Sequence, residues 1–88
     1  MRIKEGFVLR EVAGQAVVIA VGKASETFHG MINLNSTGKC IWQGVEKGWS
    51  EEEIVEDMTQ KYDVDKNRAE TDVKEMLRKM YEAGVVEA

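Results

Sequence analysis

The sequence lacks several ingredients of catalytic and membrane proteins. Its 88 residues contain no proline, one cysteine and one histidine. A single cysteine excludes an internal disulfide, and His29 has no second metal ligand at a suitable spacing, so we expect no metal and no cofactor. There is no run of 18 apolar residues, and residues 1–6 form no apolar signal core. We therefore expect a cytoplasmic protein without a transmembrane helix.

Catalytic motifs are missing as well. The sequence has no nucleophile elbow, no phosphate-binding loop and no cysteine cluster for an iron–sulfur centre. Cys40 has no paired base in view and is expected to be a nearly inert residue of a helix. A chain this short, with one cysteine and one histidine, is not expected to be an enzyme.

The composition fits one small folded domain spanning residues 1–88. Apolar residues make up 43% of the chain and charged residues 32%, which favours a soluble globule with a single core. There are 16 acidic and 12 basic residues, and the net charge is −4. Because phosphate groups repel an acidic protein, nucleic acid is not an expected partner.

The first part of the chain has the character of β-strands. Short segments rich in apolar and β-branched residues predict strands over 7–12, 15–21 and 27–34. Ala13-Gly14 supplies a tight turn between the first two, and the polar segment 22–26 is expected to be a loop. Three strands joined by short connections predict an antiparallel meander, in which the third strand lies at an edge.

The pattern becomes helical after residue 34, with helices predicted over 36–47, 51–62 and 66–83. Asn35 or Ser36 is the expected cap of the first helix, Ser50 begins a capping box, and Asp65 caps the third helix. Val85-Val86 forms a tail that folds back onto the core or adds a short strand. The order β-β-β-α-α-α predicts an α+β fold of the winged-helix type, in which a three-stranded sheet precedes a helix-turn-helix bundle.

A family resemblance rests on two parts of the sequence. The first is the run Gly30-Met31-Ile32-Asn33-Leu34-Asn35-Ser36-Thr37-Gly38, followed by Ile41-Trp42. The second is Gly48, the acidic helix 51–62, Val64-Asp65, and the pattern Asp72-Val73…Met76-Leu77…Met80…Gly84-Val85-Val86. Together they resemble the PqqD family (coenzyme PQQ synthesis protein D) over about residues 7 to 87.

The resemblance implies a winged-helix-like domain called a RiPP recognition element. Such domains bind the leader segment of a ribosomally made precursor peptide, like a peptide chaperone, and present it to a modifying enzyme, often a radical SAM protein. The proline-containing segment of the PQQ pathway protein is missing ahead of this core, and Lys39 stands where a small residue is usual. We therefore interpret the chain as a PqqD-like member that serves some peptide pathway other than that of PQQ.

In that family the leader adds a strand beside the third strand and lies against the third helix. The resemblance places the peptide-binding residues on the strand at Phe28, His29, Gly30, Met31, Ile32 and Asn33, and on the helix at Arg68, Asp72, Glu75, Met76 and Lys79. Met31 and Met76 are expected to line the groove, because methionine adapts to varied partners. Met76 and Met80 also fit plain core positions.

Two other functions remain open at this stage. A winged helix can bind DNA by placing its third helix in the major groove, although a basic stripe is absent here. An open edge strand also allows a purely structural role, in which the chain is a monomer or a strand-exchanged dimer.

Overall fold

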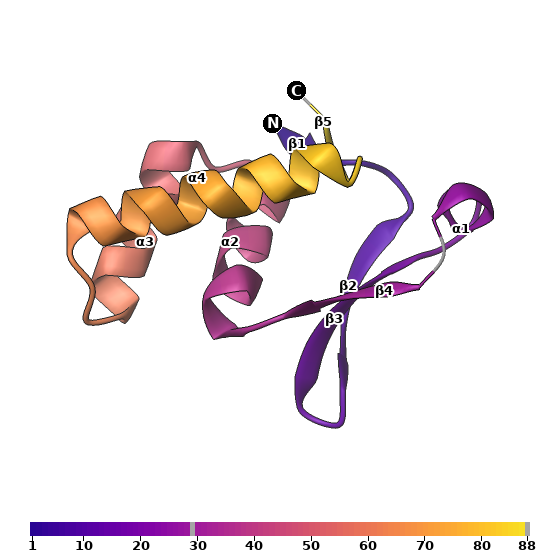
Figure 1. Cartoon of the computed structure of the whole chain (residues 1–88), viewed down its shortest axis with the longest axis horizontal. Coiled ribbons are helices and arrows are strands. Elements are labelled where there is room, and N and C mark those ends of the chain that lie inside the picture. Colours follow the sequence, from indigo (N-terminus) through magenta and orange to yellow (C-terminus); the bar gives the residue numbers. More distant parts are fainter. Residues whose placement is uncertain (29, 88) are drawn as a thin grey trace.

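A three-stranded antiparallel sheet and three packed helices make up most of the computed structural model, which describes residues 1–28 and 30–87 (Figure 1). The sheet has the order β2 (Phe7–Val12), β3 (Gln15–Ala20) and β4 (Met31–Leu34). The helices that follow it are α2 (Ser36–Glu46), α3 (Glu51–Lys61) and α4 (Lys66–Glu82). The expected α+β class, with an N-terminal sheet followed by a helical bundle, is confirmed, and β4 lies at an edge of the sheet.

A two-residue turn closes the β2–β3 hairpin. Ala13 and Gly14 have φ values of 52° and 80°, as a type I′ turn requires. The turn pairs Val12 with Gln15, and the register continues to Phe7 and Ala20 at the other end. This register controls which backbone groups of β3 are left for β4.

The segment before β4 differs from the sequence prediction. A loop was expected over 22–26 and a strand from Thr27, but a short helix, α1 (Ala24–Thr27), occupies this place and β4 begins at Met31. Phe28 packs edge-to-face on Phe7, with ring centroids 5.3 Å apart. Gly30 then has a φ of 100°, which is incompatible with a regular strand. A tertiary aromatic contact thus overrides the strand propensity of Thr27-Phe28.

Local caps place the three longer helices. The Asn35 side chain accepts a bond from the Gly38 N–H at 2.8 Å, so Asn35 rather than Ser36 is the cap of α2. Ser50 and Glu53 form the predicted capping box of α3, and Asp65 accepts from the Arg68 N–H at 2.8 Å at the start of α4. Each side chain satisfies an N–H that has no partner within its helix.

The two ends of the chain meet in a second, two-stranded sheet. β1 (Arg2–Ile3) pairs antiparallel with β5 (Val86–Glu87), and the Arg2 Nε lies 3.0 Å from a carboxylate oxygen of Glu87. The tail therefore adds a strand, while β1 was not predicted. Figure 1 shows β1 and β5 side by side above the C-terminal end of α4.

The core lies between one face of the sheet and the helices. Its fully buried side chains come from every layer: Val18, Ile41, Trp42, Val45, Ile54, Met58, Val73 and Val85. Met80 is buried with them, whereas Met76 is only half-buried at the edge of the core. Within the described residues, no helix is long and apolar enough to cross a lipid bilayer.

Candidate functional site

The hydrogen-bond pattern of the sheet decides which groups of β4 are free. In a two-residue hairpin, the residues beside the turn exchange both backbone bonds, so Gln15 bonds to β2. Because the direction of backbone bonding alternates along a strand, the odd-numbered residues of β3 all bond to β2. The Val21 N–H, just after β3, follows the same rule and donates to the Gly6 carbonyl at 2.7 Å. The even-numbered residues Ala16 and Val18 therefore bond to β4.

Two residues of β4 consequently turn their backbone away from the sheet. Ala16 pairs with Leu34 and Val18 with Ile32, so Ile32 and Leu34 carry the bonds to β3. Met31 and Asn33 alternate with them, and their N–H and C=O groups point outward. Among the described strands none but β3 pairs with β4. Two donors and two acceptors are therefore available to another extended chain.

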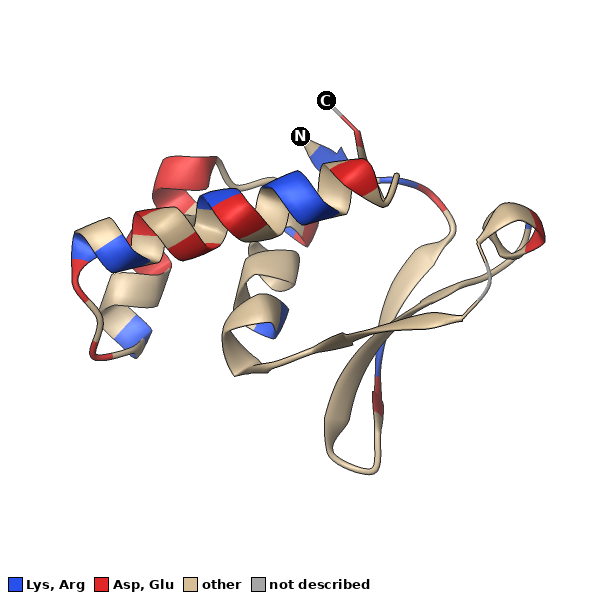
Figure 2. Ribbon diagram, in the orientation of Figure 1, with Lys and Arg blue, Asp and Glu red and all other residues tan. Residues whose placement is uncertain are grey.

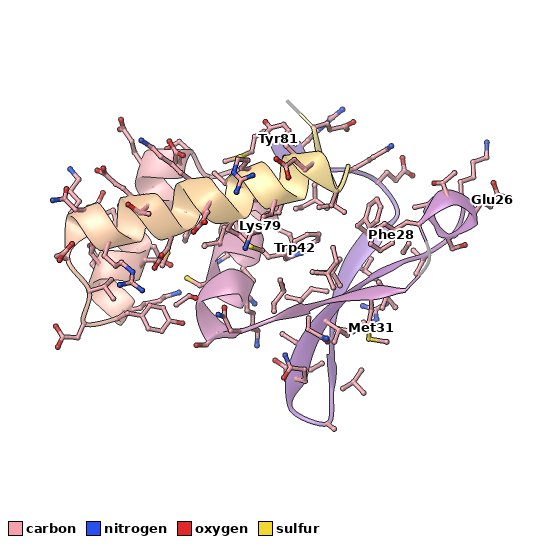
Figure 3. All side chains as sticks on the ribbon, viewed as in Figure 1. Glu26, Phe28, Met31, Trp42, Lys79 and Tyr81 are labelled. Carbon is pink, nitrogen blue, oxygen red and sulfur yellow. The ribbon has the colours of Figure 1, made fainter. Side chains whose placement is uncertain are left out.

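The side chains of β4 alternate between the two faces of the sheet. Leu34 is buried and Ile32 half-buried on the core side, whereas Met31, 59% exposed, and Asn33 lie on the opposite face. Figure 3 shows the Met31 side chain pointing away from α4. Met31 was expected to line a groove with Met76. Because side chains alternate along the strand, Met31 lies on the face away from the core, and Ile32 instead lies on the core side.

Helix α4 borders a hollow directly beyond the end of β4. All five helix residues singled out from the sequence line it, namely Arg68, Asp72, Glu75, Met76 and Lys79. The start of α2 and Val64 complete the wall with Asn35, Thr37, Gly38 and Ile41. This α2–α4 hollow has a volume of about 510 Å³. The flank of α4 that carries Asp72, Glu75 and Lys79 therefore faces this hollow.

The α2 side of this hollow was not predicted as part of the site. A signal for it was present, because Asn35, Thr37 and Gly38 belong to the Leu34–Gly38 run that carries the family resemblance. Their conformations explain the motif: Asn35 caps α2, and a Cβ at Gly38 would lie 3.1 Å from the Asn35 Oδ1. Gly38 thus lets the chain turn tightly from β4 into the helix.

The charges of the α2–α4 hollow are only partly neutralised. Arg68 Nε lies 3.4 Å from Asp72 Oδ1 on the next turn of α4, an exposed pair worth little in stability. Glu75 and Lys79 form no ion pair with any described residue. Figure 3 shows Lys79 on the side of α4 that faces β4. Both charges are therefore available to select a charged ligand.

The remaining predicted residues lie at the other end of β4. Phe28 is half-buried on Phe7, and Gly30 precedes the strand with positive φ, so neither belongs to β4 itself. Phe28 borders a smaller hollow, of about 320 Å³, between α1 and the end of α4. His29 lies outside the described residues.

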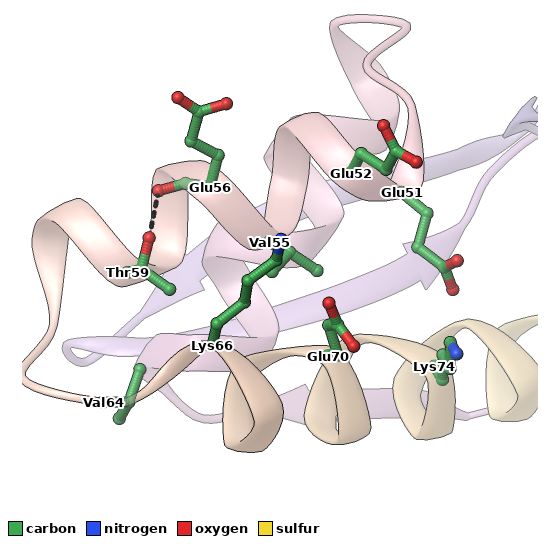
Figure 4. A pocket seen from close by; sticks show the side chains of 9 residues that line it. All are labelled: Glu51, Glu52, Val55, Glu56, Thr59, Val64, Lys66, Glu70 and Lys74. Carbon is green, nitrogen blue, oxygen red and sulfur yellow. Dashed lines mark hydrogen bonds between the residues drawn. The ribbon is translucent and has the colours of Figure 1, made fainter.

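A third hollow, between α3 and α4, is less suited to a peptide (Figure 4). Its volume is about 570 Å³, and most of its lining is charged: it contains the carboxylates of Glu51, Glu52, Glu56 and Glu70 and the ammonium groups of Lys66 and Lys74. None of its lining residues belongs to a strand, and the Thr59 hydroxyl at its wall donates a hydrogen bond to the Glu56 carbonyl. We therefore assign it no function.

The charge pattern of α4 does not favour nucleic acid. Acidic and basic residues alternate along the exposed side of this helix instead of forming a basic stripe (Figure 2). In a winged-helix protein, α4 is the helix that would enter the major groove. Within the described residues, no group of histidine, cysteine and carboxylate side chains is placed to hold a metal ion.

Cys40 has a structural partner instead of a catalytic one. Its Sγ lies 3.2 Å from Asp57 Oδ2 on α3, and Lys61 Nζ lies 3.1 Å from the same oxygen. Burial raises the pKa of the Cys40 thiol, and the neighbouring carboxylate raises it further. The thiol therefore stays protonated at neutral pH and is a poor nucleophile.

Replacing Asp57 with asparagine should make the free energy of unfolding vary less with pH in the acid range. Burial of this carboxyl raises its pKa, but the bonds from Cys40 and Lys61 outweigh burial, and the pKa of Asp57 lies below its ordinary value. The carboxylate thus stabilises the fold above the pKa of the unfolded state, and this contribution is lost as pH falls through the lowered pKa. We expect Asp57→Asn to cost about 1 kcal/mol at pH 7.

Urea unfolding of both proteins between pH 2 and pH 7 tests this expectation. The free-energy difference should shrink towards acid pH, and Glu56→Gln, which alters an exposed neighbour on α3, serves as the control. A difference that stays constant across this range would contradict the assigned role of Asp57.

The chain matches one protein-family model and is similar to two solved structures. Residues 7–86 match the family model of coenzyme PQQ synthesis protein D (PqqD). The structure is similar to TbiB1 in complex with the TbiA(beta) leader peptide, with 25% identity, a TM-score of 0.82, and coverage of 100% of this chain and 96% of that one. It is also similar to lasso peptide synthetase B1 complexed with the leader peptide, at 20% identity, a TM-score of 0.80 and coverage of 99% and 96%. Comparison with curated proteins yields no match.

Proposed function

Since this chain belongs to the PqqD family, we propose that it binds the leader segment of a ribosomally synthesised precursor peptide and presents it to a modifying enzyme. The observation that carries the proposal is the free edge of β4: Met31 and Asn33 offer unpaired backbone groups there. The α2–α4 hollow lies directly beyond the end of the same strand. The similar chain TbiB1, which was solved with a leader peptide, supports the same kind of ligand.

Backbone pairing alone is too weak to hold a disordered leader. The four free groups contribute roughly 2–6 kcal/mol, at about 0.5–1.5 kcal/mol for each hydrogen bond. Ordering the leader costs about 2–5 kcal/mol or more, whereas micromolar affinity requires about 8 kcal/mol. The deficit is met by burying two or three apolar leader side chains, at roughly 1.5–3 kcal/mol each. The α2–α4 hollow, with the buried Ile41 and half-buried Met76, is the place for them.

The edge of β4 suits this role better than the opposite edge of the sheet. The outward-facing residues of β2 include Glu11, whose carboxylate is paired with Lys39 of α2. The C-terminal end of β2, from Arg10 to Val12, is exposed. None of the three hollows described above is lined by a residue of β2 between Val8 and Val12. Of the two edges of the three-stranded sheet, β4 is therefore the one that combines free backbone groups with a neighbouring helix that can bind side chains.

The remaining parts of the proposal rest on the family. The chain acts without catalysis of its own, as an accessory that holds the leader while a radical SAM or other peptide-modifying enzyme works on the rest of the precursor. Its location is the cytosol, where ribosomes release the precursor. The departure at Lys39, where the family usually has a small residue, favours a product other than PQQ.

An NMR titration tests the proposed site. The ¹⁵N-labelled chain is titrated with synthetic leader segments of the short precursor peptides encoded beside its own gene. We expect saturable shifts in the amides of residues 30–34 and along the flank of α4 from Arg68 to Lys79, with micromolar affinity. Binding that leaves residues 31–34 unchanged would contradict the proposal, as would the absence of binding by every encoded leader.

Light scattering during the same titration distinguishes a monomeric leader complex from a strand-exchanged dimer. Two copies paired through β4 would occupy the edge that the leader needs. If the edge serves the leader, the chain is monomeric in the complex and its affinity is independent of protein concentration. An affinity that falls as the protein concentration rises would favour the structural, dimerising role.

A further inference from the structure

The hollow between α1 and the end of α4, the α1 hollow, has the features of a side-chain pocket. Its floor is the edge-to-face pair of Phe7 and Phe28, and its walls include Ala83, directly after α4. Lys4, Lys23 and Glu5 stand at its rim. A volume of about 320 Å³ is sufficient for one large side chain.

The α1 hollow and the α2–α4 hollow lie at opposite ends of β4. Phe28 precedes the strand and Asn35 follows it, while α4 runs above it in the opposite direction, from Arg68 to Ala83 (Figure 1). At about 3.3 Å for each extended residue, the segment from Phe28 to Asn35 spans at most roughly 23 Å. A bound strand of about seven residues therefore reaches from one hollow to the other.

The α1 end of this line carries an excess of positive charge in a protein whose net charge is −4. Lys4 and Lys23, which both line the α1 hollow, form no ion pair with any described residue. The opposing carboxylate at the rim is Glu5, because Glu82 is paired with Arg78 and Glu26 lies on the outer side of α1 (Figure 3). The negative end of the α4 dipole reduces this excess without cancelling it.

We infer that the α1 hollow is a second specificity pocket, which takes a large apolar side chain of the bound peptide with a carboxylate beside it. Phe7 and Phe28 contact the apolar side chain, and Lys4 and Lys23 hold the carboxylate. The inference rests on the proposed function, because the peptide reaches this hollow only when it is paired with β4. It adds a substrate class: peptides with an acidic residue next to a large apolar one, at the α1 end of the strand.

Selection from a random library of displayed 12-residue peptides tests the pocket. The intact chain is compared with Lys4→Glu/Lys23→Glu, and with Lys66→Glu/Lys74→Glu as a matched control that changes the same charge in the hollow between α3 and α4. We expect the unchanged chain and the control to select peptides with an acid beside a large apolar residue. The Lys4→Glu/Lys23→Glu variant should select basic residues at that position.

A charge exchange on one selected peptide gives the quantitative measurement. Its affinity for Lys4→Glu/Lys23→Glu should fall about tenfold, since exposed ion pairs are individually weak, and a lysine in place of its acidic residue should restore the affinity. Phe28→Leu, which keeps the core filled, should reduce affinity for peptides with an aromatic anchor. An unchanged affinity in the Lys4→Glu/Lys23→Glu variant, or no recovery with the lysine peptide, would overturn the inference.

The Asn33→Pro variant separates this inference from the proposed function. If Asn33→Pro abolishes binding of the selected peptide but the lysine variants do not affect it, the peptide pairs with β4 and only the pocket is refuted. If Asn33→Pro has no effect, the peptide does not pair with β4, and both the proposed function and the inference fail.

Discussion

Replacing Asn33 with proline is expected to weaken leader binding about ten- to hundredfold while the fold stays intact, because the variant removes an outward donor and places a ring against the incoming strand. The bonds between β3 and β4 are carried by Ile32 and Leu34, so this substitution breaks none of them. Proline is tolerated at the free edge of a sheet, and the residue before it, Ile32, already lies in a strand. Isothermal titration with the leader measures the loss.

The neighbouring position provides the contrast. Ile32→Pro removes a bond to β3 and is expected to destabilise the sheet itself, whereas Glu11→Pro places the same ring on the opposite edge and should leave leader affinity unchanged. Circular dichroism establishes that the Asn33 and Glu11 variants are folded. Equal leader affinities in these two variants would mean that the peptide does not pair with β4.

Replacing Trp42 with alanine is expected to remove about 3–5 kcal/mol of stability, the range for deleting a large aromatic side chain from a core. Trp42 is 1% exposed on α2, between the sheet and α4 (Figure 3). A domain of this size has a total stability of roughly 4–13 kcal/mol. The Trp42→Ala variant is therefore close to unfolding at 37 °C, and what remains folded should lose leader binding because α4 and β4 are no longer held at a fixed spacing.

Trp49 is the matched control for this measurement. It is half-buried in the turn between α2 and α3, with the Lys47 ammonium 4.7 Å from its ring centre. Trp49→Ala should cost about 1–2 kcal/mol, since less apolar area is lost and a cation–π contact at an exposed site is weak. Urea unfolding followed by circular dichroism compares the two variants. Equal losses of stability would contradict a central role for Trp42.

Features that depend on neighbouring residues were predictable. Asn35, Ser50 and Asp65 cap the three longer helices in the structure as expected, because a cap involves only the next three residues. The hairpin turn at Ala13-Gly14 is equally local. The buried side of α4 is local in the same sense, because helical spacing alone puts Ala69, Val73, Leu77 and Met80 on one face.

Features that depend on distant residues were predicted less well. Phe28 has a high β propensity, but in the structure it packs on Phe7 directly after α1, and β4 begins only at Met31. β1 exists only because its partner, β5, lies at the other end of the chain. The choice between core and groove for Met76 required the position of α2, which packs beside it.

The candidate site likewise has features that neighbouring residues determine and features that depend on distant ones. The amino-acid sequence alone determined that an edge strand and a charged helix flank occur, and it identified the residues of that flank. Only the tertiary structure decided that Met31 and Asn33 have the free backbone groups, and that the Met31 side chain faces away from α4. The physical reason is that backbone direction alternates with every residue, so the register imposed by the β2–β3 turn and by the position of β4 after α1 selects which groups remain unpaired.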